Sequence, residues 1–332
     1  MTSSLYCVGA ALMFLAGCGE SQSSLAPSTS AQSFHLAVSV GGVLLPTAAN
    51  PARLARAAQG PPQIPAGKRR RTELFYYLSY LNDLTGGVGA WSVPHLKFVY
   101  AVKGGVSIPD GECSKTGAET FWVADSGRDE LVEYDYGGKH PIKTLSTNGN
   151  EPTGCSVDPA SGNIATAIIS NDDVLVWLGG NGTPTTYTTP LSKNYFVGYD
   201  GSGNLFVDGF AGSVFRLAEL PKSGNSFEPV TLDQSIEFPG NVQWDGAYLA
   251  IGDQETSVVY QFACSGTNCT TNGSTLLDGA SDCVQFWIRK ATLACGDAGN
   301  GDAALWHYPA GGSPYSVTHP AAAPLGSVIV AR

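Results

Sequence analysis

Charged residues are scarce in this chain. Lys, Arg, Asp and Glu make up 14% of its 332 residues, and Met occurs only twice. These contents of charged residues and Met are too low for a protein built from long helices, which are rich in charged residues and in Leu and Met. The 28 acidic residues outnumber the 18 basic ones, giving a formal net charge of −10. Because binding to a nucleic-acid backbone depends on many cationic contacts, we expect no nucleic-acid partner.

Familiar catalytic motifs are also missing. The sequence contains no Gly-x-Ser-x-Gly, no phosphate-binding loop, no dinucleotide fingerprint and no His-Glu-x-x-His. Its five histidines lie far apart, without the spacing of metal ligands. We therefore assign no catalytic residue from these motifs and expect no required cofactor.

The abundant residues are those of short strands and tight turns. Hydrophobic residues make up 43% of the chain, enough to fill a core, and there are 41 Gly and 20 Pro. Thr, Ser, Tyr, Val and Phe are frequent as well, and several of these favour strands. The composition predicts an all-β protein.

The amino terminus has the features of an export signal. Leu5 to Leu15 is almost wholly apolar, but it is too short to cross a bilayer as a helix. Leu15-Ala16-Gly17-Cys18 resembles a bacterial lipobox, although no Lys or Arg precedes it. The resemblance implies a signal peptide over 1–17, a lipid on Cys18 and, because Glu20 and no Asp follows the cysteine, an outer-membrane location. The alternative is an ordinary secretory signal.

Residues 18–72 differ in composition from residues 73–332. They include Ser/Ala/Pro-rich stretches and the basic run Lys68 to Arg71, which is typical of a flexible tether. The four cations of this run would contact anionic lipid or polysaccharide, or else belong to a solvated linker beside an acidic domain. We favour the linker. The membrane would then be reached through the lipid anchor alone.

Residues 73–332 contain an internal repeat. Short apolar segments start at Leu74, Phe121, Asn163, Asn204, Tyr248 and Thr292, so that successive starts are 41 to 47 residues apart. Further strand-like segments surround each of them, and four strands in 40-odd residues is typical of a propeller blade. The last segment, Pro324 to Arg332, supplies the first strand that Leu74 lacks. The sequence thus predicts a six-bladed β-propeller, with four antiparallel strands per blade, closed by its carboxyl-terminal strand.

The turns and strands of this repeat carry a family resemblance. Asp158-Pro-Ala-Ser-Gly-Asn163 and Asp200-Gly-Ser-Gly-Asn204, with strands such as NLFVDGF, FWVADSG and LVEYDY, resemble NHL-type propeller repeats. The resemblance covers residues 73–332 and implies architecture rather than activity, because many unrelated functions share this scaffold.

Six cysteines remain after the signal peptide and Cys18, an even number that is typical of an exported chain. On the blade map, Cys264 and Cys269 flank one hairpin, Cys283 and Cys295 lie on adjacent strands, and Cys113 and Cys155 match on neighbouring blades. We predict these three disulfides.

Charge is divided unevenly along the chain. Residues 1–72 hold six basic and one acidic residue, which leaves 12 basic and 27 acidic residues in 73–332, a net charge of −15. Many of the acids fall in the predicted turns between second and third strands: Asp83, Asp125, Asp129, Glu130, Asp172, Asp173, Asp208, Asp253, Glu255, Asp297 and Asp302. A ring of like charge there would attract cations or basic ligands. Ordinary turn chemistry explains the same residues equally well.

A second hypothesis concerns the channel mouth. Glu112, Asn194, Asn241 and Asp282 lie near the starts of four first strands, and their order and chemistry resemble the divalent-metal set of gluconolactonase-type propellers. Such oxygen ligands suit calcium, which would polarise a lactone carbonyl. Register argues against the set, because Asp282 falls one residue and Asn194 two residues out of line with the other two.

Two functions are consistent with these observations. The first is a monomeric, lipid-anchored binding or scaffold protein of the cell envelope, with a protein, peptide or glycan ligand that is cationic if it binds the acidic turns. The alternative is a metal-dependent hydrolase or lactonase.

Overall fold

The computed structural model describes residues 38–40, 43–45, 74–82, 85–102, 105–115, 117–320 and 323–331. All of them belong to the unit that runs from residue 35 to 332. The predicted signal peptide, Cys18, the basic run from Lys68 to Arg71, and Asp83 lie outside the described residues.

The regular secondary structure of the described chain consists of β-strands, apart from one 3-10 turn, η1 (Leu178–Gly180). β1 (Val38–Val40) and β2 (Val43–Leu45) form a two-stranded antiparallel sheet. Four further sheets have four antiparallel strands each. They comprise β26 (Ala323–Ala331), β3 (Leu74–Asn82), β4 (Thr85–Ser92) and β5 (Phe98–Val102); β6 (Pro109–Cys113), β7 (Thr120–Asp125), β8 (Glu130–Asp135) and β9 (Pro141–Ser146); β10 (Pro152–Val157), β11 (Ile164–Ile168), β12 (Asp173–Trp177) and β13 (Thr185–Thr188); and β22 (Cys283–Arg289), β23 (Thr292–Asp297), β24 (Asp302–His307) and β25 (Ser316–Thr318).

The remaining sheet has eight strands. It joins β14 (Lys193–Tyr199), β15 (Leu205–Ala211), β16 (Val214–Leu220) and β17 (Glu228–Leu232) to β18 (Pro239–Trp244), β19 (Leu249–Asp253), β20 (Val258–Ser265) and β21 (Asn268–Leu276). The two runs meet where β17 and β21 pair in parallel, at Thr231 with Asn268 and Leu232 with Cys269. The described chain therefore has four separate four-stranded sheets and one eight-stranded sheet, where the sequence predicts six blades. The β20–β21 hairpin is long enough for its outer strand to reach β17.

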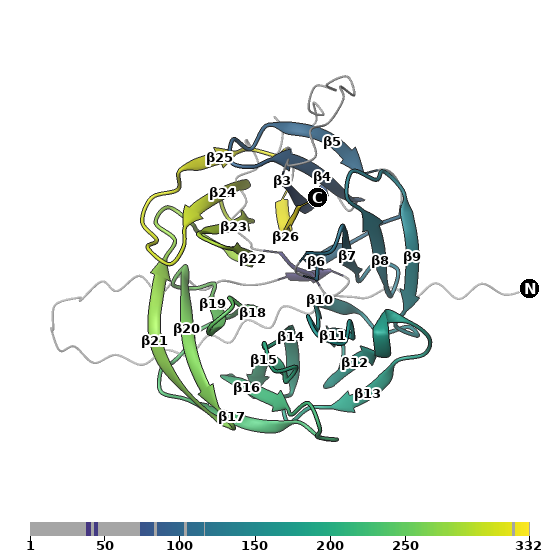
Figure 1. The fold of residues 1–332 in the computed structure, drawn as a ribbon, viewed down its shortest axis with the longest axis vertical. Coiled ribbons are helices and arrows are strands. Elements are labelled where there is room, and N and C mark those ends of the chain that lie inside the picture. Colours follow the sequence, from purple (N-terminus) through teal and green to yellow (C-terminus); the bar gives the residue numbers. More distant parts are fainter. Residues whose placement is uncertain are drawn as a thin grey trace, which may run out of the picture. The chain divides into compact units, whose positions relative to one another are not determined.

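The sheets surround a common axis in a propeller-like arrangement, with the first strand of each run innermost (Figure 1). β6, β10, β14, β18, β22 and β26 contact one another in that order, and β26 contacts β6. The predicted closure by the carboxyl-terminal strand is confirmed, because β26 pairs with β3 from Ala323–Leu81 to Ala331–Leu74. This pairing covers edges that would otherwise remain open.

Each innermost strand has an irregular register near its start. The shift lies between Pro109 and Gly111 in β6, and corresponding shifts occur in β10, β14, β18, β22 and β26. Such bulges bend a strand and redirect its side chains. The residue that follows the shift in three of these strands is Gly111, Gln285 or Gly326. These three residues therefore occupy equivalent places at the axis.

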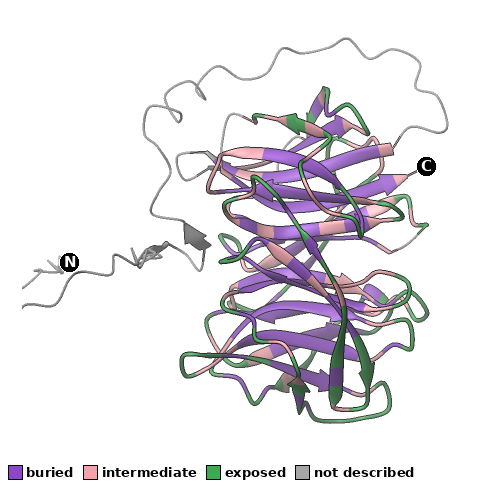
Figure 2. Ribbon diagram, turned by 90° about the vertical axis from the view of Figure 1, so that its left-hand side faces the viewer, coloured by how far each residue is buried: buried purple, intermediate pink, exposed green. Residues whose placement is uncertain are grey.

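Large apolar side chains fill the space between neighbouring sheets. Trp177 and Trp306 are fully buried, and Tyr77 of β3 stacks on Phe121 of β7 with ring centroids 4.0 Å apart. Full burial of such side chains stabilises the fold by about 1.5–3 kcal/mol each. Exposed positions concentrate at the turns and on the outer strands (Figure 2).

The three predicted disulfides are confirmed. Cys113–Cys155 joins β6 to β10, and Cys283–Cys295 joins β22 to β23. Cys264–Cys269 closes the hairpin between β20 and β21. Three disulfides are the pattern of a protein from an oxidising compartment outside the cytoplasm. Among the described residues, no helix is long and apolar enough to cross a membrane.

Candidate functional site

One side of the ring carries most of the predicted acidic residues. We call it the turn face, and it consists of the turns between second and third strands together with the segments that lead into the first strands. Because the strands within each run are antiparallel, these two kinds of segment lie at the same ends of the sheets.

Four of the predicted acids are buried beneath this face. They are Asp125, Asp208, Asp253 and Asp297, with exposed fractions of 0 to 3%. They lie at or near the ends of the second strands β7, β15, β19 and β23. The hypothesis of an exposed ring of charge therefore does not hold for these four side chains.

Three of the buried carboxylates accept hydrogen bonds from backbone amides of the segments that lead into first strands. Asp297 accepts from the N–H of Ser281 at 2.8 Å and of Asp282 at 3.0 Å. Asp125 accepts from Ser107 at 2.7 Å and Ile108 at 2.8 Å, although burial raises its pKa. Amides that would be unpaired in a buried segment are thereby satisfied.

Asp253 acts in the same way, whereas Asp208 binds an amide inside the first strand β14. Asp253 accepts from the amides of Glu237 at 3.1 Å and Phe238 at 3.2 Å. Asp208 accepts from Phe196 N–H at 2.8 Å. The alternative explanation, turn chemistry, thus accounts for Asp125, Asp253 and Asp297, which fix the turn face in place. Asp208 instead supports the irregular part of β14.

The other described acids of the predicted set remain accessible to different degrees. Asp172 and Glu255 are exposed, whereas Asp129, Glu130, Asp173 and Asp302 are half-buried. Besides His319, whose Nδ1 lies 4.0 Å from Asp302 Oδ2, the basic side chains of the described turn face are Arg128 and Lys193. Arg128 donates to the carbonyl of Gly105, and Lys193 lies 5.2 Å from the Tyr195 ring centroid. The turn face therefore presents accessible acidic side chains above the buried aspartates that hold its turns.

Gln285, which sequence analysis does not identify, links innermost strands at the axis. Gln285 of β22 accepts from the amide of Glu112 and donates to its carbonyl, both at 2.7 Å. It also accepts from Ser327 N–H at 3.0 Å, so it links three innermost strands. A Cβ on Gly111 or Gly326 would lie 3.3 or 3.2 Å from the Gln285 amide. The two glycines therefore make room for Gln285.

Glu112, the first residue of the predicted metal set, is fully buried beside this link. Neither of its carboxylate oxygens has a hydrogen-bond partner among the described residues. Burial raises the pKa of Glu112 well above its ordinary value. The pKa of nearby Asp110 is raised well above its ordinary value by the same cause, and its Oδ2 also lacks a partner within the described chain.

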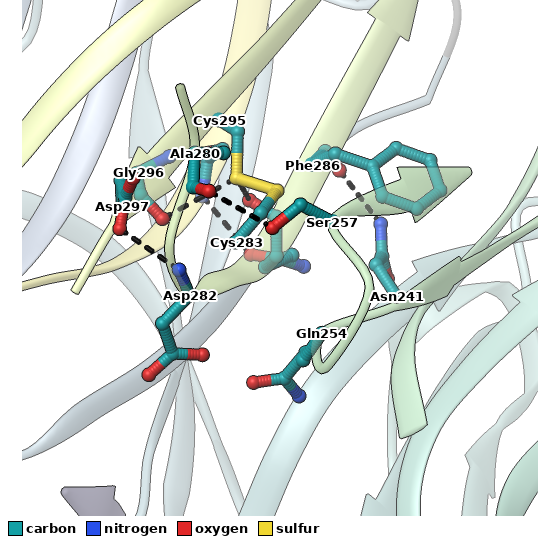
Figure 3. Close-up of a disulfide and its surroundings, with 12 residues drawn as sticks. Asn241, Gln254, Ser257, Ala280, Asp282, Cys283, Phe286, Cys295, Gly296 and Asp297 are labelled. Atoms are coloured by element: carbon teal, nitrogen blue, oxygen red, sulfur yellow. Dashed lines mark hydrogen bonds between the residues drawn. A yellow bond between two sulfur atoms is a disulfide. The ribbon is translucent and has the colours of Figure 1, made fainter. Parts of the chain in front are cut away.

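Two other members of the predicted metal set are engaged in the fold. Asn194 accepts from Thr189 Oγ1 and donates to the carbonyl of Asp173, both at 2.9 Å. Asn241 donates to the carbonyl of Phe286 at 2.7 Å. Figure 3 shows the Asn241 amide turned towards Phe286, whereas the Asp282 carboxylate points away from it. Within the described residues, no group of three His, Cys, Asp or Glu side chains could hold a metal ion. Calcium binding stays a prediction.

A sequence signal for the crowded axis did exist. Three first strands carry Pro-x-Gly at or next to their first residue, at Pro109, Pro152 and Pro324, and closely approaching backbones need glycine. A Cβ on Gly111 would lie 2.6 Å from Gly154 Cα. The partner of these glycines, Gln285, has no such motif, and only the structure identifies it.

Comparison with known proteins agrees with the architecture. No family model matches the chain, and no curated protein matches it. Among solved structures, the chain is similar to one in the "Crystal structure of Nidogen/Laminin Complex", with a TM-score of 0.62 and 14% sequence identity. The match covers 78% of this chain and 98% of that chain. At this identity the likeness shows the fold alone, a β-propeller.

Proposed function

We propose that this protein is a non-catalytic binding module that takes a cationic ligand on its turn face. The observation that supports this most is that acidic residues occur at two levels on this side, one buried and one exposed. Buried aspartates fix the turns, and Asp172, Glu237 and Glu255 are exposed on the same side. Loops held by a rigid scaffold are frequent binding surfaces, and like charge gathered on one side attracts ligands of opposite charge.

The charge of the opposite side supports this assignment. Lys97, Lys115, Lys139, Lys222 and Lys290 all lie in the connections at the other ends of the sheets, together with acidic residues. Acidic residues there, such as Glu119, Asp135, Asp158, Asp200 and Asp245, roughly balance these lysines. The opposite side is therefore close to neutral whereas the turn face is acidic, and a basic ligand would favour the turn face.

Finer features complete the proposal. The two halves of the eight-stranded sheet would act as two blades, which gives six blades of the NHL type. Three disulfides support export. The lipobox-like sequence at Cys18 would anchor the module to the cell envelope, in the outer membrane, by a tether over residues 18–72.

The proposal is tested with fluorescent decalysine as the cationic probe. The triple variant Asp172→Asn, Glu237→Gln, Glu255→Gln should bind it about tenfold more weakly than the unaltered chain. Three exposed charge contacts of about 0.5 kcal/mol each correspond to roughly this change in Kd. Fluorescence anisotropy at low salt measures the affinity, which should fall further as salt is added.

A matched control removes the same charge from the other side. Glu119→Gln, Asp135→Asn, Glu228→Gln neutralises three exposed acids away from the turn face. This variant should keep the affinity of the unaltered chain. Equal weakening in both variants would show that only net charge matters, and the turn face would then have no special role.

The metal-dependent hydrolase is the second candidate. The observation that favours it is the Glu112 carboxylate, which has no hydrogen-bond partner in the part of the chain that the structure describes. Calcium titration followed by thermal unfolding separates the two functions. A rise in Tm with calcium that disappears in Glu112→Gln would support the metal site. Because Asn194 and Asn241 are engaged elsewhere, we expect no difference between the two proteins in their response to calcium.

A further inference from the structure

A pocket lies between the β6–β9 and β10–β13 sheets, away from the turn face. It has a volume of about 180 Å³, and Lys115, Trp122, Glu133, Lys143 and Gly180 are among the residues that line it. Sites for drug-sized ligands measure about 300–1,000 Å³, so this pocket suits a smaller molecule, such as one sugar ring.

The pocket is built on a row of side chains that crosses the whole β6–β9 sheet. Cys113 pairs with Trp122, Trp122 with Glu133, and Glu133 with Lys143. Directly opposed residues share one face of a sheet, and this face is turned to β10–β13. The row starts at the axis with the Cys113–Cys155 disulfide to the neighbouring sheet.

The outer end of the row is also tied to the neighbouring sheet. Lys143 Nζ donates to the carbonyl of Gly180 and to Asn181 Oδ1, both at 2.5 Å, and lies 5.7 Å from the centre of the Trp122 ring. Both ends of the pocket are therefore fixed before any ligand arrives, and such preorganisation favours binding.

The polar groups of the pocket are unequally satisfied. Glu133 has a hydrogen bond with the Thr120 side chain, and this bond and Lys143 partly offset the burial that raises its pKa. Lys143 is engaged with Gly180 and Asn181. The Lys115 ammonium makes no hydrogen bond or ion pair with any described side chain. Two lysines and one glutamate give the pocket a formal charge of +1, whereas residues 73–332 carry −15.

We infer that this pocket binds one acidic sugar residue, a pyranose ring that carries a carboxylate. Its carboxylate would pair with Lys115, a hydroxyl would donate to Glu133, and the ring carbons would pack against Trp122 and Ile164. This site is independent of the proposed turn-face function, because it lies between two sheets and uses different side chains.

Other small ligands match the pocket less well. A neutral sugar would leave Lys115 without a counter-charge, and a small inorganic anion would leave the apolar floor and Glu133 unused. A zwitterionic amino acid carries no net charge, so the pocket would keep its formal charge of +1. A hydroxylated monoanion satisfies all of these groups.

The test uses glucuronate and its uncharged analogue glucuronamide with the full chain, and isothermal titration calorimetry measures their affinities. Glucuronate should bind at one site, and Lys115→Met should weaken it by at least about tenfold, as expected for a lost contact between charged groups. Glucuronamide should bind more weakly and should be unaffected by Lys115→Met. Glu133→Gln should weaken both sugars. Lys139→Met, an exposed lysine outside the pocket, is the matched control and should change neither.

Several results would overturn the inference. These are equal affinities for glucuronate and glucuronamide, a glucuronate affinity unchanged in Lys115→Met, or no binding at about 10 mM glucuronate, a concentration that would half-fill a site with a Kd of about 10 mM. Binding of glycine with the same dependence on Lys115 and Glu133 would assign the pocket to amino acids instead. Circular dichroism spectra of Lys115→Met and Glu133→Gln would show whether these two variants remain folded.

Discussion

The innermost and outermost strands of the ring differ in almost every physical property. β6 is buried at every position, whereas β9, in the same sheet, is buried only at Leu145. Innermost strands are joined across sheets by Cys113–Cys155 and by the Gln285 hydrogen bonds. Outermost strands meet only through short contacts in the described chain, such as the two residue pairs of β17 with β21. Stability should therefore depend mainly on the axis, which leaves the periphery and the turns for binding.

The largest expected effect comes from the cross-link at the axis. Cys113→Ala with Cys155→Ala opens a link between residues 42 apart, and loop entropy predicts a loss of about 4 kcal/mol. Cys264→Ala with Cys269→Ala opens a link between residues 5 apart at the periphery and should cost about 2 kcal/mol. Urea unfolding without reductant measures both. Equal losses would remove the difference between axis and periphery.

The next effect concerns the buried aspartates below the turn face. Asp297→Ala leaves the amides of Ser281, Asp282 and Asn300 without their acceptor, and we expect a loss of about 3 kcal/mol. Asp278→Ala is the matched control, because this exposed carboxylate accepts only from Ser313 Oγ among its described contacts. Its loss should be within about 0.5 kcal/mol. Similar unfolding free energies for the two variants would contradict a structural role for Asp297.

A smaller effect, visible only across pH, is expected at Glu112. Burial raises its pKa above the ordinary 4.5, so the native state holds this proton to higher pH than the unfolded chain does. Stability should therefore fall as pH rises from 4.5 towards the raised pKa. Glu112→Gln removes this fall, which amounts to about 1.4 kcal/mol for each unit by which the pKa is raised. Parallel pH profiles of unfolding free energy in the two proteins would contradict the assignment.

The smallest effect belongs to the outer strands. Ile142 of β9 is 51% exposed, so little apolar surface is lost from the core when it is replaced. Ile142→Ser should change the free energy of unfolding by no more than about 0.5 kcal/mol. A loss above about 2 kcal/mol, as for a core residue, would show that the periphery supports the ring more than the burial pattern indicates.

Much of the architecture was predictable because it repeats along the chain. The spacing of strands, the three disulfides and the pairing of β26 with β3 all follow from period and from the complementary ends of the repeat. The parallel contact of β17 with β21 was not predictable, because it depends on the length of one hairpin and on its distance from a strand some 40 residues earlier.

The site was less accessible to sequence reasoning. Aspartates in turns give the same sequence pattern whether their carboxylates face solvent or bind backbone amides. Only the structure distinguishes these two cases, as it does for the buried Asp297. Gln285 cannot be identified from the sequence, because its role depends on glycines of other innermost strands. Gly326 lies on the neighbouring innermost strand, and Gly111 lies on the strand after that. The row of Trp122, Glu133 and Lys143 becomes a pocket only when a second sheet faces it.

The central claim is that the ring presents its acidic turns as a fixed binding surface. The most direct measurement is the ratio of decalysine Kd values for the two triple variants, the turn-face variant (Asp172, Glu237 and Glu255) and the opposite-face variant (Glu119, Asp135 and Glu228). Both lose the same charge, so the ratio reports position alone. We predict a ratio of about ten at low salt. A ratio of one would contradict the claim.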